Sequence, residues 1–493
     1  MSGASDRWNP IFLKELRQSL RGRVFGILFP TTVLAGVAVA ITAMVDLHPR
    51  PIAGPDVLLP VLVVLGVAAL GLVPFSAFQS MGGEWDDGTH DLLVLSHLSP
   101  GRIVLGKLLS AAVESVLYFA GFAPVLLFTF LLSGVDLRDL LFLIGALYAA
   151  SIAMSAVALA LAGLTRSRFW RVVLLAATAG LAFLALVLGY DLAETFVKRG
   201  RGLGTGHASE DVAATIGLIL AFGTLFTAIA STRLAHPEDD RSGPVRWTVS
   251  GLLVALLAAV TTVGAGFMSS VPVFEVAALV GALAAAFAVF FVTEPERLPR
   301  RAAARVPRNA ALAVLAAPFL PGGGRGVLWW LLQLAILAAW ATAVAAWHGA
   351  GRARPWTPGT FGQWCAFQSY FLVYLAGFSL ALGRVRERSY GPLAARLILP
   401  SVAVLSMVLP LLAGFLSGET NPIRDSILFP TGAMQREPHA PKSLVALVVG
   451  GVVLALNLPR LITSFAQVLA ASARRRRPLP APLERPTDAA HAG

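Results

Sequence analysis

Acidic side chains crowd a short hydrophilic stretch that lies between two long apolar runs. Glu84, Asp86 and Asp87 fall close together, and Asp91 follows one helical turn later. Carboxylates placed this densely attract a cation or the basic surface of another protein. The stretch 84–107 is therefore a candidate binding surface.

The first part of this stretch carries the start signal of a short helix. Gly88 interrupts the preceding structure, and Thr89 can cap a new helix. Asp91 would then lie in the first turn, where a negative charge suits the helix dipole. Leu92 and Leu95 belong to the one-sided apolar run that follows, so a short amphipathic helix is predicted here.

A second start signal follows at Ser99 and Pro100. Serine is a favoured capping residue, and proline is favoured at the first helical position. The helix that begins there is predicted to continue directly into a membrane span. A loop that only connects two spans needs no such organisation, so we expect two short cytoplasmic helices on which another protein acts.

The segment from Gly101 to Leu108 resembles a nucleotide-binding P-loop only superficially. A P-loop needs Ser or Thr after its lysine to hold magnesium, but Leu108 stands there. No buried strand precedes Gly101, and Lys107 opens a membrane span, where we expect an interfacial anchor. The chain is thus predicted to lack an ATP site, so any ATPase would be another polypeptide.

The other reactive residue types do not form a recognisable site. The eight histidines are scattered, and His90 and His97 could share a helix face but lack a third ligand nearby. Zinc-protease, nucleophile-elbow and paired-carboxylate patterns are missing from the sequence. We expect no enzymatic active site, no metal and no cofactor.

Glu114 is an ionisable residue about two turns into a predicted span. Such residues are functional candidates because a charge is costly in the hydrocarbon. Glu114 either lines a transport path or forms a hydrogen bond between helices.

The elements that must position these residues are membrane spans. The chain is 56% hydrophobic and 13% charged, and its mean hydropathy is +0.74. A soluble domain has about 25% charged residues, whereas apolar runs long enough to cross a bilayer recur along this chain. These properties predict an all-α, polytopic membrane helix bundle. The net charge of +12 comes from basic clusters at span ends, without a nucleic-acid motif, so membrane lipids and not nucleic acid are the expected anionic contacts.

About twelve spans of roughly 20 residues are predicted. They cover 24–46, 57–78, 107–133, 137–164, 169–190, 211–233, 246–269, 272–292, 327–347, 361–383, 393–416 and 443–466. Residues 1–23 form a cytoplasmic N-terminus, in which Asn9 and Pro10 begin an interfacial amphipathic helix. Apolar residues 310–319 are too short to span, so they should lie on the membrane or pack on the bundle.

The basic residues orient the spans. With the N-terminus inside, inner loops and the tail 471–493 hold about three times as many Lys and Arg as the outer loops do. Both termini are therefore predicted to be cytoplasmic, and the tail is expected to be disordered.

The succession Glu-x-x-x-Gly-Thr-x-acid-x-Leu, Leu-Ser-Pro and Ile-Val-Leu-Gly-Lys-Leu-Leu within residues 84–109 resembles the cytoplasmic loop of ABC-2 type transporter permeases. The stretch from Asn9 to Arg21 is similar to the entry helix of the same family, and the resemblance covers roughly 8–235. It implies a multi-pass permease subunit of an ATP-driven exporter in a bacterial inner membrane. The coupling surface for a cytoplasmic ABC ATPase would comprise Glu84, Asp86, Asp87, Gly88, Thr89, Asp91, Leu92, Leu95, Ser99 and Pro100.

Two other functions fit the same spans. A gradient-driven secondary transporter commonly has about this number of spans, and a non-transporting membrane scaffold could recruit an ATPase without moving a substrate. The sequence does not identify the substrate. It also does not tell whether the chain pairs with a second permease chain, identical or different.

The expected domains are an ABC-2-like half at 24–235, with its coupling loop at 79–107, and a second half at 236–470. A shift of 303 places Val24 on Val327 and Glu84 on Glu387. This pattern suggests a degenerate repeat, with generic membrane architecture as the alternative explanation.

Overall fold

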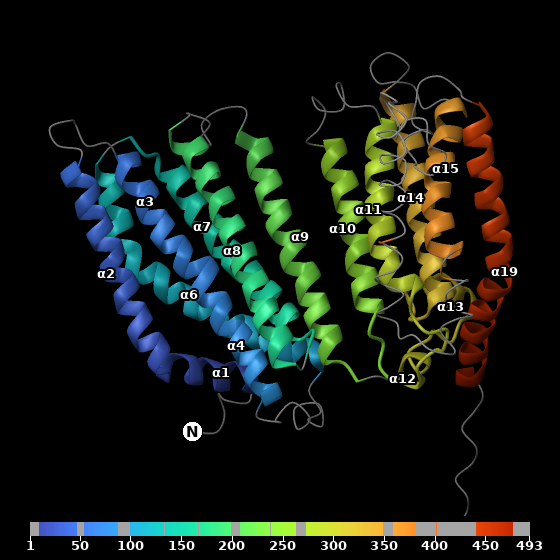
Figure 1. Ribbon diagram of the computed structural model, residues 1–493, viewed down its shortest axis with the longest axis horizontal. Helices are drawn as coiled ribbons and strands as arrows, with labels where there is room; N and C mark the ends of the chain where they lie inside the picture. Colours follow the sequence, from blue (N-terminus) through green and yellow to red (C-terminus); the bar gives the residue numbers. More distant parts are fainter. Residues whose placement is uncertain are drawn as a thin grey trace, which may run out of the picture. The chain divides into compact units, whose positions relative to one another are not determined.

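The computed structural model describes most of the 493-residue chain. The described residues are 9–46, 54–86, 99–132, 134–165, 167–198, 208–236, 238–262, 273–348, 358–377, 379, 401 and 440–476. Within these ranges almost every residue is helical and no strand occurs, so the predicted all-α architecture is confirmed (Figure 1).

Ten helices in the described part of the chain are long and apolar enough to cross a membrane. They are Arg23–Val45, Gly54–Glu84, Pro100–Leu131, Leu137–Ala162, Arg168–Val197, Val212–Leu234, Gly243–Thr261, Val273–Val292, Gly323–Trp347 and Leu444–Arg475. A multi-pass membrane protein follows from these lengths and compositions. The number twelve is not confirmed. The span predicted at 361–383 is described only through 377 and at 379, and that at 393–416 lies outside the described residues except for position 401.

The chain divides into two compact units, Met1–His236 (unit 1) and Pro237–Gly493 (unit 2). Unit 1 contains α1 (Pro10–Arg21), α2 (Arg23–Asp46), α3 (Gly54–Gly66), the π-helix η2 (Val67–Leu72), α4 (Val73–Asp86), α6 (Pro100–Leu131), α7 (Leu137–Ala162), α8 (Arg168–Val197) and α9 (Ala208–Leu234). Helices α3, η2 and α4 form one continuous span.

The core of unit 1 is built around α7, which packs against α4, α6, α8 and α9. Leu58, Val61 and Leu65 of α3 are inaccessible to solvent, and Ala158 and Leu159 of α7 are equally buried. Helices α2 and α9 instead bury few of their apolar side chains, as expected for helices that face lipid.

Helix α1 begins where the sequence predicted. The Asn9 side chain accepts a hydrogen bond from the Ile11 amide at 3.1 Å, and Pro10 occupies the first turn. Figure 1 shows α1 lying across the end of unit 1, at a steep angle to the span α2. Its apolar face is divided: Ile11 and Phe12 are buried against protein, whereas Leu20 remains 36% exposed.

Unit 2 contains α10 (Gly243–Thr262), α11 (Val273–Val292), α12 (Arg300–Ala303), α13 (Ala310–Ala316), the 3-10 helix η4 (Ala317–Phe319), α14 (Gly323–His348), α15 (Pro358–Leu372), the π-helix η5 (Val373–Gly377) and α19 (Ala440–Arg476). The short apolar segment predicted at 310–319 forms α13 and η4. It packs on α19 through a cluster that includes Ala313, Ala317 and Val468.

The basic tail differs from its prediction at its start. Helix α19 continues to Arg476, so residues 471–476 are helical, and 477–493 lie outside the described residues. The helix persists because Ser472 donates to the Arg308 carbonyl at 2.9 Å and Arg475 donates to the Val306 carbonyl at 2.6 Å. These contacts offset the entropy cost of ordering the segment, which its composition alone does not reveal.

Candidate functional site

The candidate site lies where the hydrophilic loop joins its two flanking helices. Of the predicted coupling residues, Asp87, Gly88, Thr89, Asp91, Leu92 and Leu95 lie outside the described residues, as do the two short helices predicted there. Asp86 ends α4, and Glu84 precedes it by two residues.

Ser99 and Pro100 open α6 as the sequence predicted. Ser99 is the extended capping residue, and Pro100 is the first residue of the helix. The Ser99 hydroxyl makes no capping bond, but its carbonyl accepts from the amides of Arg102 at 2.9 Å and Ile103 at 3.2 Å. The backbone conformation, and not the side chain, therefore starts this helix.

A buried triad of charges joins both stems of the loop to α1. The Lys107 ammonium of α6 lies 2.9 Å from a Glu84 oxygen of α4 and 2.9 Å from a Glu15 oxygen of α1. The three residues are only 3%, 5% and 7% exposed, in that order. The triad therefore connects α4 and α6, which flank the loop, to α1, which lies much earlier in the sequence.

The expectation that Lys107 is an interfacial anchor is wrong. Helix α1 covers it, and its ammonium also donates to the Ser80 carbonyl at 3.2 Å. A lysine at a span end reaches water only where no neighbouring element closes over it. The Gly101–Lys107 segment lies within α6, in helical backbone.

The end of α4 is held by two basic side chains. Lys107 contacts the Ser80 carbonyl, and Arg171 of α8 donates to the Gly82 carbonyl at 2.7 Å. Positive charges are favourable near the C-terminal carbonyls of a helix. The residues that precede the loop are thus fixed from two sides.

Glu114 extends the polar cluster two turns along α6. Its carboxylate accepts from the hydroxyls of Ser19 at 2.8 Å and Ser76 at 3.0 Å, and the residue is 5% exposed. Ser19 lies on α1 and Ser76 on α4, so Glu114 connects the same three helices as Lys107. Of the two readings of Glu114, the hydrogen bond between helices is present in the structure.

Lys107 and Glu114 line one polar cavity of about 410 Å³, together with Glu15, Gln18, Ser76 and Glu84. The residues that line this cavity include three buried carboxylates and one buried ammonium. A buried carboxylate needs a partner because the charge is poorly solvated. The arrangement suits the positioning of helices.

Sequence reasoning found Glu84 and Glu114 but missed Glu15 and Lys107 as their partners. The available signal was spacing: Glu15 and Ser19 are one turn apart on α1, and Lys107 and Glu114 are two turns apart on α6. Each pair therefore shares a helix face. The contact predicted between Glu84 and an ATPase stays a prediction, but its carboxylate already has a partner within the chain.

The π-helix η2 lies one turn from this cluster. The Ser115 hydroxyl donates to Ser151 of α7 at 3.1 Å, and Ser151 donates to the Ala69 carbonyl at 2.6 Å. A π-helix disturbs the regular backbone bonding of a span, and a nearby serine can satisfy the released carbonyl. These two bonds therefore join α6, α7 and η2 next to the polar cluster.

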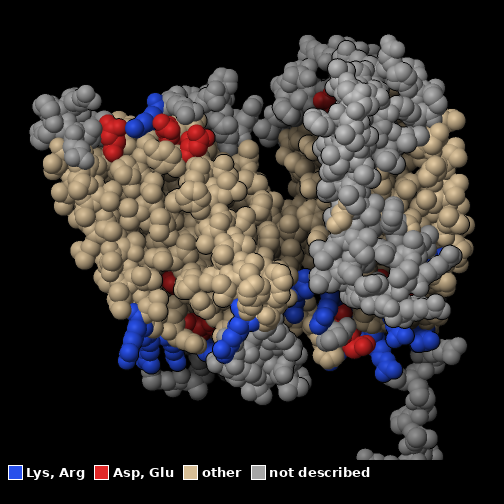
Figure 2. Space-filling model, in the orientation of Figure 1, with Lys and Arg blue, Asp and Glu red and all other residues tan. Residues whose placement is uncertain are grey.

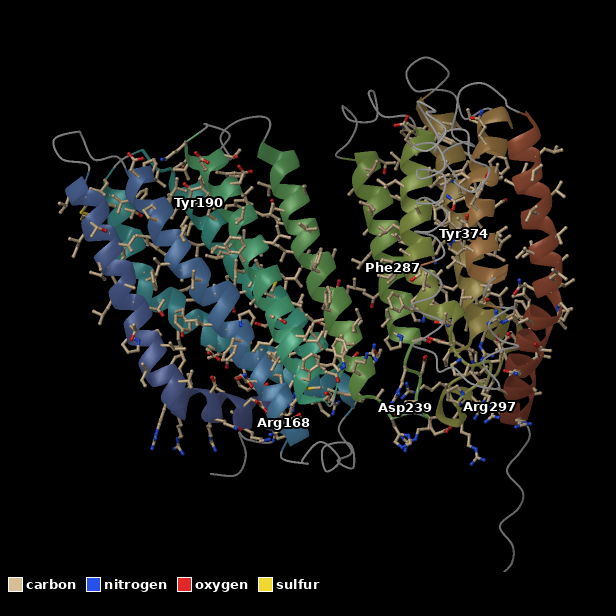
Figure 3. The ribbon with its side chains drawn as sticks, viewed as in Figure 1. Arg168, Tyr190, Asp239, Phe287, Arg297 and Tyr374 are labelled. Atoms are coloured by element: carbon tan, nitrogen blue, oxygen red, sulfur yellow. The ribbon has the colours of Figure 1, made fainter. Side chains whose placement is uncertain are left out.

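Charge is distributed unequally between the ends of unit 1. Figure 2 shows basic side chains gathered at the α1 end and acidic side chains at the opposite end. Figure 3 places Arg168 and Tyr190 near opposite ends of α8. The loop stems therefore lie at the basic end, which the positive-inside rule assigns to the cytoplasm.

A comparison with protein-family models, curated proteins and solved structures found no match.

Unit 2 contains a separate buried ion cluster around Glu294, directly after α11. One Glu294 oxygen accepts from Arg246 at 2.8 Å, from the Ser242 hydroxyl at 3.1 Å and from the Gly322 amide at 2.8 Å. Arg246 is fully buried and also donates to the Leu320 carbonyl at 2.6 Å. The cluster fixes the end of the linker 293–326 against α10 and α11.

The glycines of the linker allow this close packing. Gly322 has a φ of +139°, which favours glycine. A Cβ atom on Gly326 would lie 2.5 Å from a backbone atom of Phe291. Gly322 and Gly326 therefore let this part of the chain pack closely against the end of α11.

Proposed function

We propose that the chain is the membrane-spanning permease subunit of an ATP-driven ABC-type exporter in a bacterial inner membrane. The loop 84–107 would receive a separate cytoplasmic ATPase. The observation that supports this best is the buried triad of Glu15, Glu84 and Lys107, which joins both stems of the loop to α1.

The triad gives the loop a way to move several helices together. A force on the loop would reach α4 through Glu84 and α6 through Lys107, and Glu15 would transfer it to α1. Buried ion pairs fix geometry because separating the partners leaves an uncompensated charge. A loop that only connected two spans would not require this rigid junction.

The arrangement of unit 1 also agrees with the family resemblance. It has six of the candidate spans, with the hydrophilic loop between the second and the third. The entry helix expected from the resemblance is α1, and it contacts α6 directly. These features favour the permease over the secondary transporter, which no specific observation supports.

The decisive experiment is purification of the tagged chain from its native host in mild detergent, followed by mass spectrometry. A P-loop ATPase should accompany the protein in fixed stoichiometry. The double charge reversal Asp86→Lys and Asp87→Lys should reduce its recovery because the acidic surface is lost.

The matched control is Glu275→Lys, a charge reversal at an exposed residue in the first turn of α11. This variant should retain the ATPase. Recovery of the protein without any ATPase would reject the exporter and favour gradient-driven transport. An ATPase that binds but shows no substrate-stimulated hydrolysis would instead identify a scaffold.

A further inference from the structure

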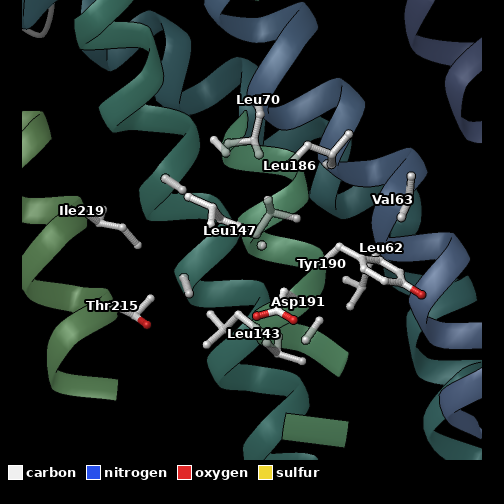
Figure 4. A pocket seen from close by; sticks show the side chains of 18 of the residues that line it. Leu62, Val63, Leu70, Leu143, Leu147, Leu186, Tyr190, Asp191, Thr215 and Ile219 are labelled. Atoms are coloured by element: carbon white, nitrogen blue, oxygen red, sulfur yellow. The ribbon is translucent and has the colours of Figure 1, made fainter. Parts of the chain in front are cut away.

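A second pocket of unit 1 has a polar end and an apolar depth. It lies between α3, η2, α7, α8 and α9, and its volume is about 710 Å³. Ligand pockets in proteins commonly measure about 300–1,000 Å³. Figure 4 shows Tyr190 and Asp191 toward one end and Leu70 and Leu186 toward the other.

The depth of the pocket matches a hydrocarbon chain in one bilayer leaflet. Its α3 wall begins at Leu59, and Leu70 of η2 closes it. Eleven residues of helix rise over roughly 16 Å, and half of a hydrocarbon core is about 15 Å. A molecule entering beside Asp191 would thus extend toward the middle of the membrane.

The deep wall of the pocket is apolar because the free backbone carbonyl of the π-helix forms its hydrogen bond outside the pocket. The Ala69 carbonyl accepts from Ser151, a residue that is fully buried outside the pocket lining. Leu59 and Leu70 are each 2% exposed. The π-helix therefore shapes the pocket without adding a polar group to it.

The polar end of the pocket lies in an acidic region. The described carboxylates at this end of unit 1 are Asp56, Asp136, Asp139, Asp191 and Glu194, and the described cations there are Arg138 and Lys198. Lys198 is already paired with Asp56 at 3.1 Å. Carboxylates outnumber cations among these described side chains, which favours a cationic group at the polar end of the pocket.

From these observations we propose that the pocket binds a long-chain amphiphile with a cationic head group, taken from the membrane leaflet on the side opposite the loop 84–107. The alkyl chain lies between Leu59, Leu70 and Leu186, and the head group lies beside Asp191. This inference goes beyond the proposed function and does not depend on it.

The test uses the full chain in phosphatidylcholine nanodiscs, without an ATPase. The probe is a long-chain alkyl amine that carries a photoreactive group in mid-chain, and peptide mass spectrometry locates the cross-links. We expect labelling of the lining residues of α3, α7 and α8. An alkyl carboxylate of the same length should label less.

Two glycines of α8 provide a matched pair of variants. A Cβ atom at either Gly189 or Gly180 meets no atom within 4 Å, but only Gly189 lines the pocket. Gly189→Phe should fill the pocket and abolish labelling, whereas Gly180→Phe should leave it unchanged. Equal labelling of both variants would overturn the proposal, because binding would then lie elsewhere.

Asp191→Asn tests the choice of head group. Removal of one exposed charge should weaken amine binding by about threefold to fivefold and leave the carboxylate probe no weaker. If the amine and the carboxylate bind equally well to the native chain, the pocket accepts any lipid tail and the cationic assignment is rejected.

Discussion

Lys107 is the residue on which the candidate site depends most. Its ammonium compensates the buried carboxylates of Glu15 and Glu84. Lys107→Met should lower the stability of the protein by about 3–5 kcal/mol, because two carboxylates would remain buried without a counter-charge. Thermal unfolding in detergent measures the loss.

The same residues provide the control. Adding Glu15→Gln and Glu84→Gln to Lys107→Met removes the uncompensated charges, so much of the lost stability should return. Lys14→Met alters an exposed lysine that lines the same cavity and should have little effect. A triple variant as unstable as the single one would show that packing around Lys107, and not charge, stabilises the junction.

Asp240 should give unit 2 a distinctive dependence on pH. Burial raises the pKa of its carboxyl, although the Gly243 amide and the Arg246 guanidinium oppose the rise. The nearby Glu294 carboxylate raises this pKa further. The folded chain therefore holds the proton more tightly than the unfolded chain does.

The sign of the effect follows from this difference in proton affinity. The ionised Asp240 costs stability above its folded-state pKa, and the cost disappears as the pH falls below the unfolded value. Asp240→Asn should be more stable than the native chain at neutral pH, because Asn still accepts from Gly243. Melting curves of the two proteins should converge as the pH falls below the unfolded-state pKa of the carboxyl, and a constant difference across the range would contradict this.

For single residues, the sequence indicates which side chains are functional candidates better than it indicates which side chains they contact. Glu114 was identified because an acid inside an apolar span stands out. Its bonds to Ser19 and Ser76 depend on how α1 and α4 pack against α6, which no local pattern specifies. Lys107 was misjudged for the same reason, since its exposure depends on a helix about ninety residues away.

Among the elements, the π-helix η2 is held by one hydroxyl. Ser151 donates to the Ala69 carbonyl, and it is fully buried. Ser151→Ala should destabilise the protein by about 1–3 kcal/mol, because the carbonyl would remain buried without a donor. Hydrogen exchange at residues 67–72 should become faster.

Ser155 is the matched control for this variant. It is also fully buried on α7, but its hydroxyl bonds only to the Ser151 carbonyl of its own helix. Ser155→Ala should therefore leave exchange in η2 nearly unchanged. Similar acceleration in both variants would mean that general packing of α7, and not the bond to Ala69, maintains the π-helix.

The spans themselves could be predicted because length and hydropathy determine them. The described helix Arg168–Val197 contains the predicted span 169–190, and the helix Val273–Val292 begins one residue after the predicted span 272–292 and ends with it. The sequence does not predict the π-helices η2 and η5. A π-helix shifts the backbone hydrogen bonds by one residue, and in an apolar span this shift does not change the pattern of apolar residues. The helical start of the tail was missed because its partners lie on the linker 293–326.

Taken as a whole, the two units share a succession of local structures. Asn9 and Asn309 both cap a short helix that precedes a span, at 3.1 and 3.0 Å from the bonded amide. In each unit the second span after this short helix contains a π-helix, η2 in unit 1 and η5 in unit 2. Packing differs, since α2 lies against α3 whereas α14 lies chiefly against α11. The repeat of the two halves stays a prediction, and only the order of these short structural features supports it.

The orientation of the chain gives the last prediction. Basic residues lie at the α1 end of unit 1, and the positive-inside rule places this end in the cytoplasm. Replacing the single cysteine, Cys365, by Ala gives a background for labelling. A cysteine at Arg17 or Arg474 should be protected in intact cells from a reagent that cannot cross the membrane, because both termini are predicted to be inside.

A cysteine at Arg138 should react in the same cells, since α7 begins at the opposite end of unit 1 and Arg138 is exposed there. Opening the cells should make Arg17→Cys and Arg474→Cys reactive and leave Arg138→Cys as before. Protection of Arg138→Cys together with labelling of Arg17→Cys would invert the topology. The loop 84–107 would then face away from any cytoplasmic ATPase, so this measurement bears on the proposed function as well as on the fold.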